Sequence, residues 1–217
     1  MKQLVIPQLA TTPADAELVP ALLDEASVPF QPIDNANWKA DYPYAPKVQF
    51  RLAYTADAFL IHYQVEEGSV AAVAPHDCGH VWEDSCCEFF AQIADDDLYY
   101  NLECNAAGTL LVACGPEREG REVAPQSVLQ QVKRWSSLGR EPFSQRIGDV
   151  KWQLALVVPF TTFFRHHISS MNGKTFRANF YKCGDKLLRP HFLSWNPIAI
   201  PRPDFHRKDF FGQIITQ

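Results

Sequence analysis

The sequence contains no apolar run long enough to cross a membrane. Its longest runs, such as 70–74 and 154–158, fall far short of the roughly 18 residues that a membrane helix needs. The N-terminal residues also lack the apolar stretch of a signal peptide, because Pro7 and Gln8 interrupt it. As the sequence is written, we expect a cytoplasmic protein with no membrane partner, exported only if a signal has been removed.

Blocks of basic residues are also absent. The chain has 20 Lys and Arg against 25 Asp and Glu, a formal net charge of −5. Segment 201–208 mixes aromatic residues with cations, but its charges are typical of a solvated loop. Nucleic acid is therefore excluded as an expected partner.

Cysteines are few, and common catalytic motifs are missing. The six cysteines lie mostly in apolar segments, which is typical of reduced core residues. The sequence has no P-loop, GxGxxG turn, GxSxG elbow or HExxH helix. We assign no catalytic residue, and the nucleotide-binding, esterase and zinc-protease chemistries that these motifs serve are excluded.

No internal repeat or linker-like change in composition divides the chain. Of its 217 residues 47% are apolar, which is enough for a large core. Residues 1–217 are therefore predicted to form one domain, with 1–30 as an N-terminal strand and helix extension. We expect helix in 14–26, with Pro20 as a break point, and a single helical turn in 159–164.

Alternation of apolar and polar residues is the dominant pattern, and it predicts half-buried strands. Nine or ten strands are expected, at 48–54, 58–66, 85–92, 97–105, 109–114, 127–135, 152–158, 176–180 and 210–215. Segment 115–121 is interpreted as a long hairpin loop. Because no βαβ repeat accompanies these strands, the predicted fold class is all-β: an antiparallel β-sandwich, Ig-like or jelly-roll-like, with a short N-terminal helix.

One face of the expected strand 97–105 is a row of polar side chains. Tyr99, Asn101, Glu103 and Asn105 share this face, spaced about 7 Å apart. A second row is formed by Arg177, Asn179 and Tyr181. Planar amide, carboxylate and guanidinium groups can hydrogen-bond neighbouring hydroxyls, so these rows favour a sugar ligand.

Two tryptophans lie at strand ends beside polar residues. Trp82 and Trp195 could stack on the flat face of a sugar ring, or they could cap the ends of the core. Trp152 belongs to a regular apolar alternation and is assigned to the core.

Several motifs, in order, are similar to those of the carbohydrate-binding modules of family 9. They are WEDSCCEFF (82–90), YYNLECNAAG (99–108), FRANFYKCGD (176–185), PHFLSWNP (190–197), PDFH (203–206) and FG (211–212). The resemblance implies a β-sandwich that holds a sugar between two tryptophans without catalysing a reaction. Trp82 resembles one stacking tryptophan, Glu88 the acidic contact, Asn105 an amide contact and Trp195 the second tryptophan. The chain departs from the family at Glu103, where the better-known modules carry arginine.

The predicted ligand is therefore a monosaccharide or oligosaccharide, bound by Trp82, Glu88, Glu103, Asn105, Arg177, Asn179 and Trp195. The resemblance also implies a role in polysaccharide metabolism in association with glycoside hydrolases, and a companion glycosidase or a homodimer is left open. No cofactor is expected, although calcium at Asp95–Asp97 and zinc at His76, Cys78 and His80 are alternatives.

Two other functions remain open at this point. Glu88 and Glu103 fall on strands that are expected to be adjacent, and a carboxyl pair that cleaves a glycosidic bond is therefore one alternative. Alternatively, the domain is a structural or interaction module with a vestigial sugar site.

Overall fold

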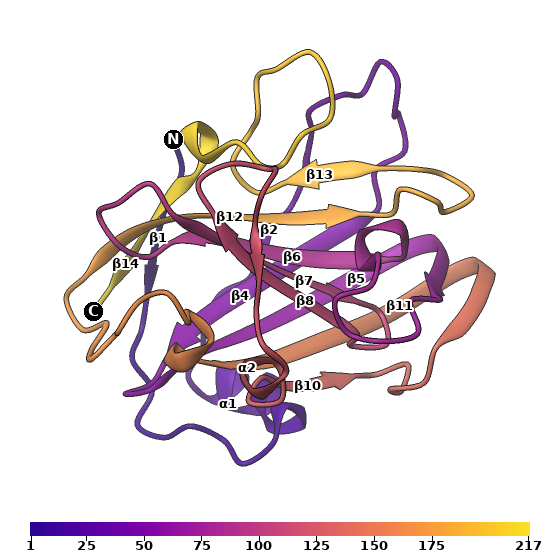
Figure 1. The fold of residues 1–217 in the computed structure, drawn as a ribbon. Helices are drawn as coiled ribbons and strands as arrows, with labels where there is room; N and C mark the ends of the chain where they lie inside the picture. The colour runs from indigo at the N-terminus through magenta and orange to yellow at the C-terminus, as the bar shows by residue number, and fades with distance from the viewer.

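The computed structural model describes residues 1–217 and contains two β-sheets packed face to face (Figure 1). The larger sheet comprises, in spatial order, β1 (Gln3–Ile6), β14 (Gly212–Thr216), β12 (Thr175–Cys183), β6 (Cys86–Gln92), β7 (Tyr99–Asn105), β8 (Leu110–Gly115) and β9 (Glu122–Val123), with β13 (Phe192–Ser194) paired to β12 and β3 (Asn35–Ala36) paired to β13. The smaller sheet comprises β10 (Lys133–Ser136), β11 (Phe143–Pro159), β5 (Ala58–Ala72), β4 (Lys47–Tyr54) and β2 (Gln31–Pro32).

Helices are short and peripheral. The α-helices are α1 (Val19–Glu25) and α2 (Gln126–Leu129), and single 3₁₀ turns occur at Ala16–Leu18, Val81–Glu83, Phe160–Thr162 and Lys208–Phe210. The expected N-terminal helix is present, with a 3₁₀ turn before α1. Pro20 lies in the first turn of α1, where its missing N–H removes no helical hydrogen bond. None of these helices has the length and apolar character that spanning a bilayer requires.

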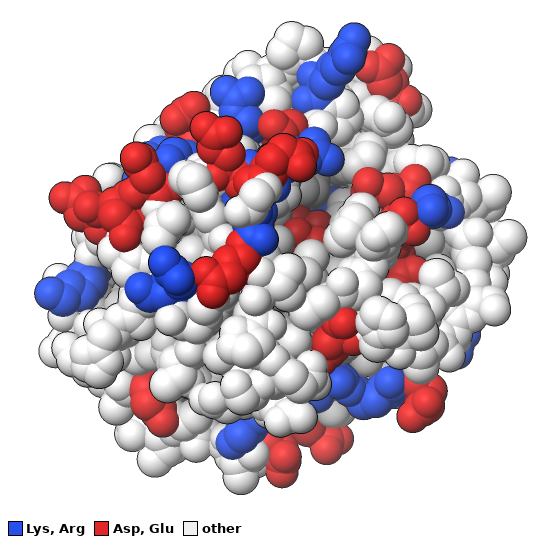
Figure 2. All heavy atoms as spheres, in the orientation of Figure 1, with Lys and Arg blue, Asp and Glu red and all other residues white.

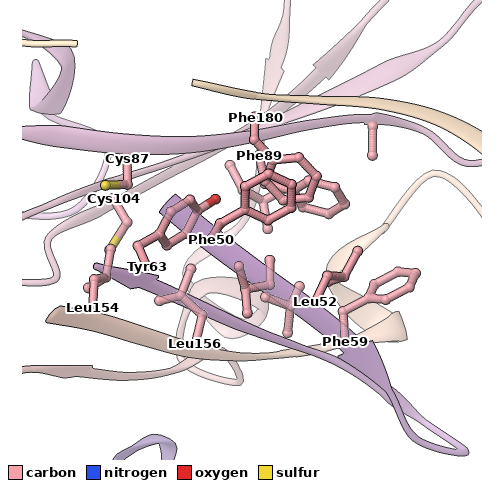
Figure 3. Packing of buried hydrophobic residues seen from close by; sticks show 14 of the residues in the cluster. Phe50, Leu52, Phe59, Tyr63, Cys87, Phe89, Cys104, Leu154, Leu156 and Phe180 are labelled. Carbon is pink, nitrogen blue, oxygen red and sulfur yellow. The ribbon is translucent and has the colours of Figure 1, made fainter. Parts of the chain in front are cut away.

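The main core lies between the two sheets, where the longer strands contribute their alternate apolar residues (Figure 3). Phe50 of β4 stacks on Phe180 of β12 with ring centroids 3.6 Å apart, and Phe89 of β6 stacks on Phe180 at 4.9 Å. Trp152 is buried here as predicted. The stacked rings join the two sheets at the centre of the molecule.

The structure confirms the predicted β-sandwich and corrects two details of it. Strand β1 pairs with β14 in the parallel direction, whereas every other strand pair in the two sheets is antiparallel. The strand expected at 127–135 is also wrong in its first half, because 126–129 form α2 and only 133–136 join a sheet as β10. Pro125 is the N-cap of α2 and favours the start of a helix there. The short apolar run that follows is compatible with a helix or a strand, so it did not distinguish the two.

A second, smaller core covers part of the outer face of the larger sheet. Trp38 and Phe205, from two chain segments that lie together at the top of Figure 1, pack over Tyr181 of β12. The Trp38 Nε1–H donates to the Ile200 carbonyl oxygen at 2.8 Å, which ties the two segments together. These segments leave β6, β7 and β8 partly uncovered, and there the surface is hollowed into a pocket.

Candidate functional site

A pocket of about 440 Å³ opens on the outer face of the larger sheet. Its floor is formed by β6, β7 and β8, and its walls come from 78–82, the hairpin loop 115–121, and the segments around 185 and 203–206. Its lining combines carboxyls, guanidinium groups and aromatic rings, among them Trp82, Glu88, Phe90, Glu103, Arg118, Glu119, Arg121, Asp185, Phe192, Asp204 and Phe205. Figure 2 shows Asp and Glu interspersed with Lys and Arg over one face of the molecule, with a group of acidic residues at its left edge.

Glu88 and Glu103 lie side by side on the pocket floor. They are direct cross-strand partners in the β6–β7 pair, so their Cβ atoms are expected about 4.5–5.5 Å apart on the same face. Glu88 is only 2% exposed and Glu103 only 4%. The prediction that Glu88 and Glu103 lie on adjacent strands is therefore confirmed.

A chain of hydrogen bonds fixes one oxygen of Glu103. Asn101 Nδ2 donates to Glu103 Oε1 at 2.8 Å, and Arg121 Nε donates to Asn101 Oδ1 at 2.8 Å. The guanidinium group of Arg121 also lies over the Tyr99 ring, 4.1 Å from its centroid. The other oxygen, Glu103 Oε2, is buried and has no hydrogen-bond partner. A buried acceptor of this kind favours a ligand that brings a donor.

Burial dominates the electrostatics of the two carboxyls. It raises the pKa of Glu103 to about 7, while the hydrogen bond from Asn101 acts in the opposite direction. Burial, and next the neighbouring Glu103, hold the pKa of Glu88 well above its ordinary value. The pKa of Asp185, also in the pocket, is raised to about 6 by burial and then by Glu83. At neutral pH the pocket floor is thus less negative than its carboxyl count indicates.

Trp82 lies on the pocket wall in the 3₁₀ turn Val81–Glu83, and it is partly exposed. Its indole stacks on the His80 ring with centroids 4.6 Å apart. Asp84, two residues after Trp82, accepts hydrogen bonds from the backbone N–H groups of Val73 and Ala74, at 2.9 and 3.0 Å. Trp82 therefore lies in a loop before β6, as the sequence indicated, and Asp84 fixes the end of this loop.

Asn105 does not line the pocket, contrary to its predicted role as a contact. Its Nδ2 donates to Asp84 Oδ2 at 2.8 Å, and its Oδ1 accepts from the N–H groups of Ala107 and Thr109. The amide is fully buried because it closes the β7–β8 turn and holds the Asp84 carboxylate. Asn105 is therefore a positioning residue for the loop that carries Trp82.

The prediction that Trp195 forms a second stacking surface is wrong for this structure. Its side chain is 2% exposed and belongs to the core between the sheets. The indole packs edge-on against Phe50 and Phe180, at 5.9 and 6.1 Å between centroids. The polar residues beside Trp195 in the sequence suggested an exposed segment. The segment is instead buried, and the Asn35 side chain donates hydrogen bonds to the Ser194 and Trp195 carbonyls.

Arg177 and Asn179 also lie outside the pocket. Asn179 is buried and hydrogen-bonds both the N–H and the C=O of Asn196, at 2.8 and 3.0 Å. Arg177 Nη2 donates to the carbonyl of Lys208 at 2.7 Å. The alternation correctly placed both residues on the outer face of β12, but the C-terminal segment folds over that face and uses their hydrogen-bonding groups.

Several pocket residues were not among the predicted site residues. Asn101 belongs to the polar row of β7, so the alternation that indicated Glu103 could also have indicated Asn101. Arg118, Arg121, Asp185 and His206 come from loops, where no periodicity signals which way a side chain points.

Tyr99 OH and His206 Nδ1 lie 2.9 Å apart, and burial lowers the His206 pKa to about 3, so this ring is neutral.

Residues of metal-ligating types gather at one place only: Cys86, Glu88 and Cys183. The structure does not bring His76, Cys78 and His80 together as a zinc site, since His80 instead stacks on Trp82. Asp95–Asp97 do not form such a cluster either. There, Asp96 contacts His166 and Asp97 contacts Lys208. All six cysteines are free thiols, and five of them are buried.

Comparison with known proteins identifies the family. The model of carbohydrate-binding family 9 matches residues 17–216. A protein from Bacteroides uniformis, for which carbohydrate binding has been suggested, is 52% identical and superposes with a TM-score of 0.97, with 100% of this chain and 99% of that chain covered.

More distant structures share the fold. A family 9 module from Caldicellulosiruptor kristjanssonii in complex with cellotriose is 10% identical, with a TM-score of 0.60 and 100% and 94% of the two chains covered. A family 9 module from the same organism in complex with glucose is 9% identical, with a TM-score of 0.54 and coverage of 100% and 96%. No curated protein sequence matches significantly. Because the family model spans nearly the whole sequence, the chain belongs to carbohydrate-binding family 9.

Proposed function

We propose that the pocket on the outer face of β6, β7 and β8 binds a sugar. The observation that carries the proposal is the buried, unpartnered Glu103 Oε2 on the pocket floor, with Trp82 on the wall. A ligand hydroxyl supplies the donor that this oxygen lacks. The Trp82 indole offers an apolar surface to the C–H face of the same ring.

Family membership supports a carbohydrate as the ligand. Modules of this fold have been found with cellotriose and with glucose, which favours a monosaccharide or a short oligosaccharide here as well. The site differs from a two-tryptophan clamp in having Trp82 without Trp195. Phe192 and Phe205 are the other aromatic residues beside the polar groups, so the apolar side of the sugar is expected to meet a mixed aromatic wall.

The role proposed for the pocket is recognition without catalysis, in a protein that works beside enzymes of polysaccharide breakdown. Each neutral hydrogen bond contributes about 0.5–1.5 kcal/mol net, and each charged one about 1.5–3 kcal/mol. With only a few such groups and one tryptophan, we expect dissociation constants between about 1 μM and 1 mM.

Calorimetric titration with a panel of mono- and disaccharides tests the proposal. We expect saturable binding that Trp82→Ala weakens by about tenfold or more, because the apolar contact of the ring is lost. Glu103→Gln is expected to weaken it by a similar factor, since one of the two accepting oxygens is replaced by an NH₂ group that only donates. Arg177→Ala is the control, because Arg177 was predicted as a contact but lies outside the pocket.

Two results would overturn the proposal. Saturable sugar binding that survives both Trp82→Ala and Glu103→Gln would place the site elsewhere. Absence of binding across the panel by the folded wild-type protein would instead favour a structural module with a vestigial site.

The paired carboxyls support a second candidate, glycoside hydrolysis. Direct cross-strand partners have Cβ atoms about 4.5–5.5 Å apart, which allows their carboxyls to reach the separations of about 5–9.5 Å that glycosidases use. Incubation with aryl glycosides separates the two functions. Turnover that Glu88→Gln abolishes would identify an enzyme, whereas binding without turnover supports recognition alone.

A further inference from the structure

Two thiols and a carboxyl meet at the pocket floor. Cys86 and Glu88 lie on β6, Cys183 lies on the neighbouring β12, and Cys86 and Cys183 are direct cross-strand partners. The two Sγ atoms and a Glu88 oxygen all lie within 4.8 Å of one another. Sugar recognition requires neither thiol, so the proposed function leaves this cluster unexplained.

The three side chains share one face of the sheet and are fully buried. Residues 86 and 88 point the same way because they are two positions apart on a strand. Cys87, between them, points to the opposite face and belongs to the core between the sheets. Glu88 and Cys183 also line the pocket, so a small ion can reach the cluster from solvent through the pocket.

We propose that Cys86, Cys183 and Glu88 form a binding site for a divalent cation of the zinc class. Two sulfurs and one carboxylate oxygen are a ligand set that suits zinc and does not suit magnesium or calcium, which prefer oxygen ligands alone. Zinc–sulfur bonds of about 2.3 Å place two thiolates closer than 4.8 Å around one ion, so the side chains need only small movements. The fourth position of the ion faces the pocket.

A second observation points to a cation at this place. Glu103, the direct partner of Glu88 across β6 and β7, has one buried oxygen without a hydrogen-bond partner. When no sugar hydroxyl occupies that oxygen, it is available to the ion or to a water molecule bound by it. The positive charges of Lys182 and Arg121 act on Glu88 and Glu103 respectively, and they offset the extra negative charge of two thiolates and a carboxylate around a divalent ion.

Binding of the ion releases protons. At present Cys183 Sγ–H donates to Glu88 Oε1 at 3.0 Å. The ion takes the place of this proton and of the Cys86 proton, and both leave to solvent as the metal–sulfur bonds form, with no change of oxidation state. Glu88, whose pKa burial raises, binds as a carboxylate, so a proton carried by its carboxyl also leaves to solvent. The inference does not depend on the proposed sugar function, because the ligands are the protein's own side chains.

Metal-free, reduced protein titrated with Co²⁺ tests the site. We expect one Co²⁺ per chain, a thiolate-to-cobalt charge-transfer absorption band, and displacement of Co²⁺ by Zn²⁺. Cys86→Ala and Cys183→Ala should each weaken Co²⁺ binding at least about tenfold. Cys87→Ala is the matched control: it lies one residue from Cys86 and is equally buried, but on the other face, so its Co²⁺ affinity should equal that of the wild type.

If either cysteine variant fails to fold, Glu88→Gln decides, since it preserves the shape of the side chain and an acceptor for Cys183. It should weaken Co²⁺ binding while the thiolate band of the remaining complex persists. Wild-type protein that binds Co²⁺ without a thiolate band, or not at all, overturns the proposal. So does a Cys87→Ala variant that loses as much affinity as Cys183→Ala.

Discussion

At the scale of single residues, Asn105 and Asn179 use the same amide group to hold two different parts of the chain in place. Both amides are fully buried and hydrogen-bonded through both ends. Asn105 holds the loop of Trp82 through Asp84, whereas Asn179 holds the turn at Asn196. Only Asn105 is connected to the pocket.

We therefore predict that Asn105→Ala and Asn179→Ala both destabilise the protein, by about 1–3 kcal/mol each, because buried partners lose hydrogen bonds. Asn105→Ala should also weaken sugar binding, since the Trp82 loop loses the side chain that holds Asp84. Urea unfolding and calorimetric titration measure the two effects. If Asn105→Ala lost sugar affinity with unchanged stability, Asn105 would be a direct contact after all.

His62 gives the protein a stability that depends on pH. The ring is buried on the outer face of the smaller sheet, where Nδ1 accepts from Arg51 Nε at 3.0 Å and Nε2 lies 2.8 Å from Gln153 Oε1. Arg51 is in turn paired with Asp24 of α1 at 2.6 Å. Burial lowers the His62 pKa from 6.5 to about 4, so the ring is neutral in the folded protein.

Between about pH 6.5 and 4 the unfolded chain binds a proton at His62 that the folded protein does not bind. The free energy of unfolding therefore falls as the pH falls, by about 2 kcal/mol from this residue at about pH 5. We expect His62→Gln, which cannot take up this proton, to lose less stability than the wild type between about pH 7.5 and about pH 5. Parallel pH profiles of urea unfolding for the two proteins would refute this assignment.

The sequence predicted which face each of these residues occupies but not what covers that face. Alternation placed Glu103, Asn105 and Asn179 on the outer side of the larger sheet, and the structure agrees. Whether such a residue meets solvent or another part of the chain depends on segments far away in sequence, such as 196–210 over Asn179. Glu103 stays in the pocket because no segment covers β7 at that point.

At the scale of elements, the end of β13 brings Trp195 into the core. Trp195 packs against Gly212 of β14 so closely that a Cβ at Gly212 would lie 2.5 Å from the Trp195 ring. We predict that Trp195→Ala destabilises the protein by about 3–5 kcal/mol, as expected for a large ring lost from a packed core. Trp195→Phe should cost less, because most of the volume is kept.

Thermal and urea unfolding of the two Trp195 variants measure these costs. Sugar affinity of Trp195→Phe should equal that of the wild type, since the indole does not reach the pocket. A variant that kept full stability but lost the sugar would restore the two-tryptophan clamp.

Loops limited the prediction at this scale more than strands did. The strand expected at 48–54 nearly matches β4 (Lys47–Tyr54), and the one expected at 176–180 lies within β12 (Thr175–Cys183), which continues three residues further. The hairpin loop 115–121 was also foreseen, but nothing in its sequence shows that Arg121 turns back over Tyr99 and Asn101 to form a wall of the pocket. The orientation of a loop side chain depends on its contacts with residues far away in the sequence. A single sequence does not show which residues those are.

At the scale of the whole molecule, a buried ion pair joins the two sheets. Lys182 Nζ of β12 lies 2.9 Å from Glu67 Oε2 of β5, and neither side chain is exposed. Trp152 Nε1 of β11 donates to Glu67 Oε1 at 2.7 Å, and Lys182 also donates to His191 Nε2 at 2.8 Å. Burial and next Lys182 hold the His191 pKa well below its ordinary value, so this ring is the neutral acceptor of the network.

A buried ion pair contributes less to the free energy of unfolding than the destabilisation seen when one partner is removed. The reason is that folding removes both charges from water, which costs free energy. We predict that Lys182→Met destabilises the protein by about 3–5 kcal/mol, since Glu67 then remains charged and unpaired between the sheets. Adding Glu67→Gln should recover a large part of that loss, because the uncompensated charge disappears while Trp152 keeps its acceptor. Urea unfolding of the two single variants and the double variant gives the coupling free energy. Costs that simply add would mean that Lys182 and Glu67 act independently.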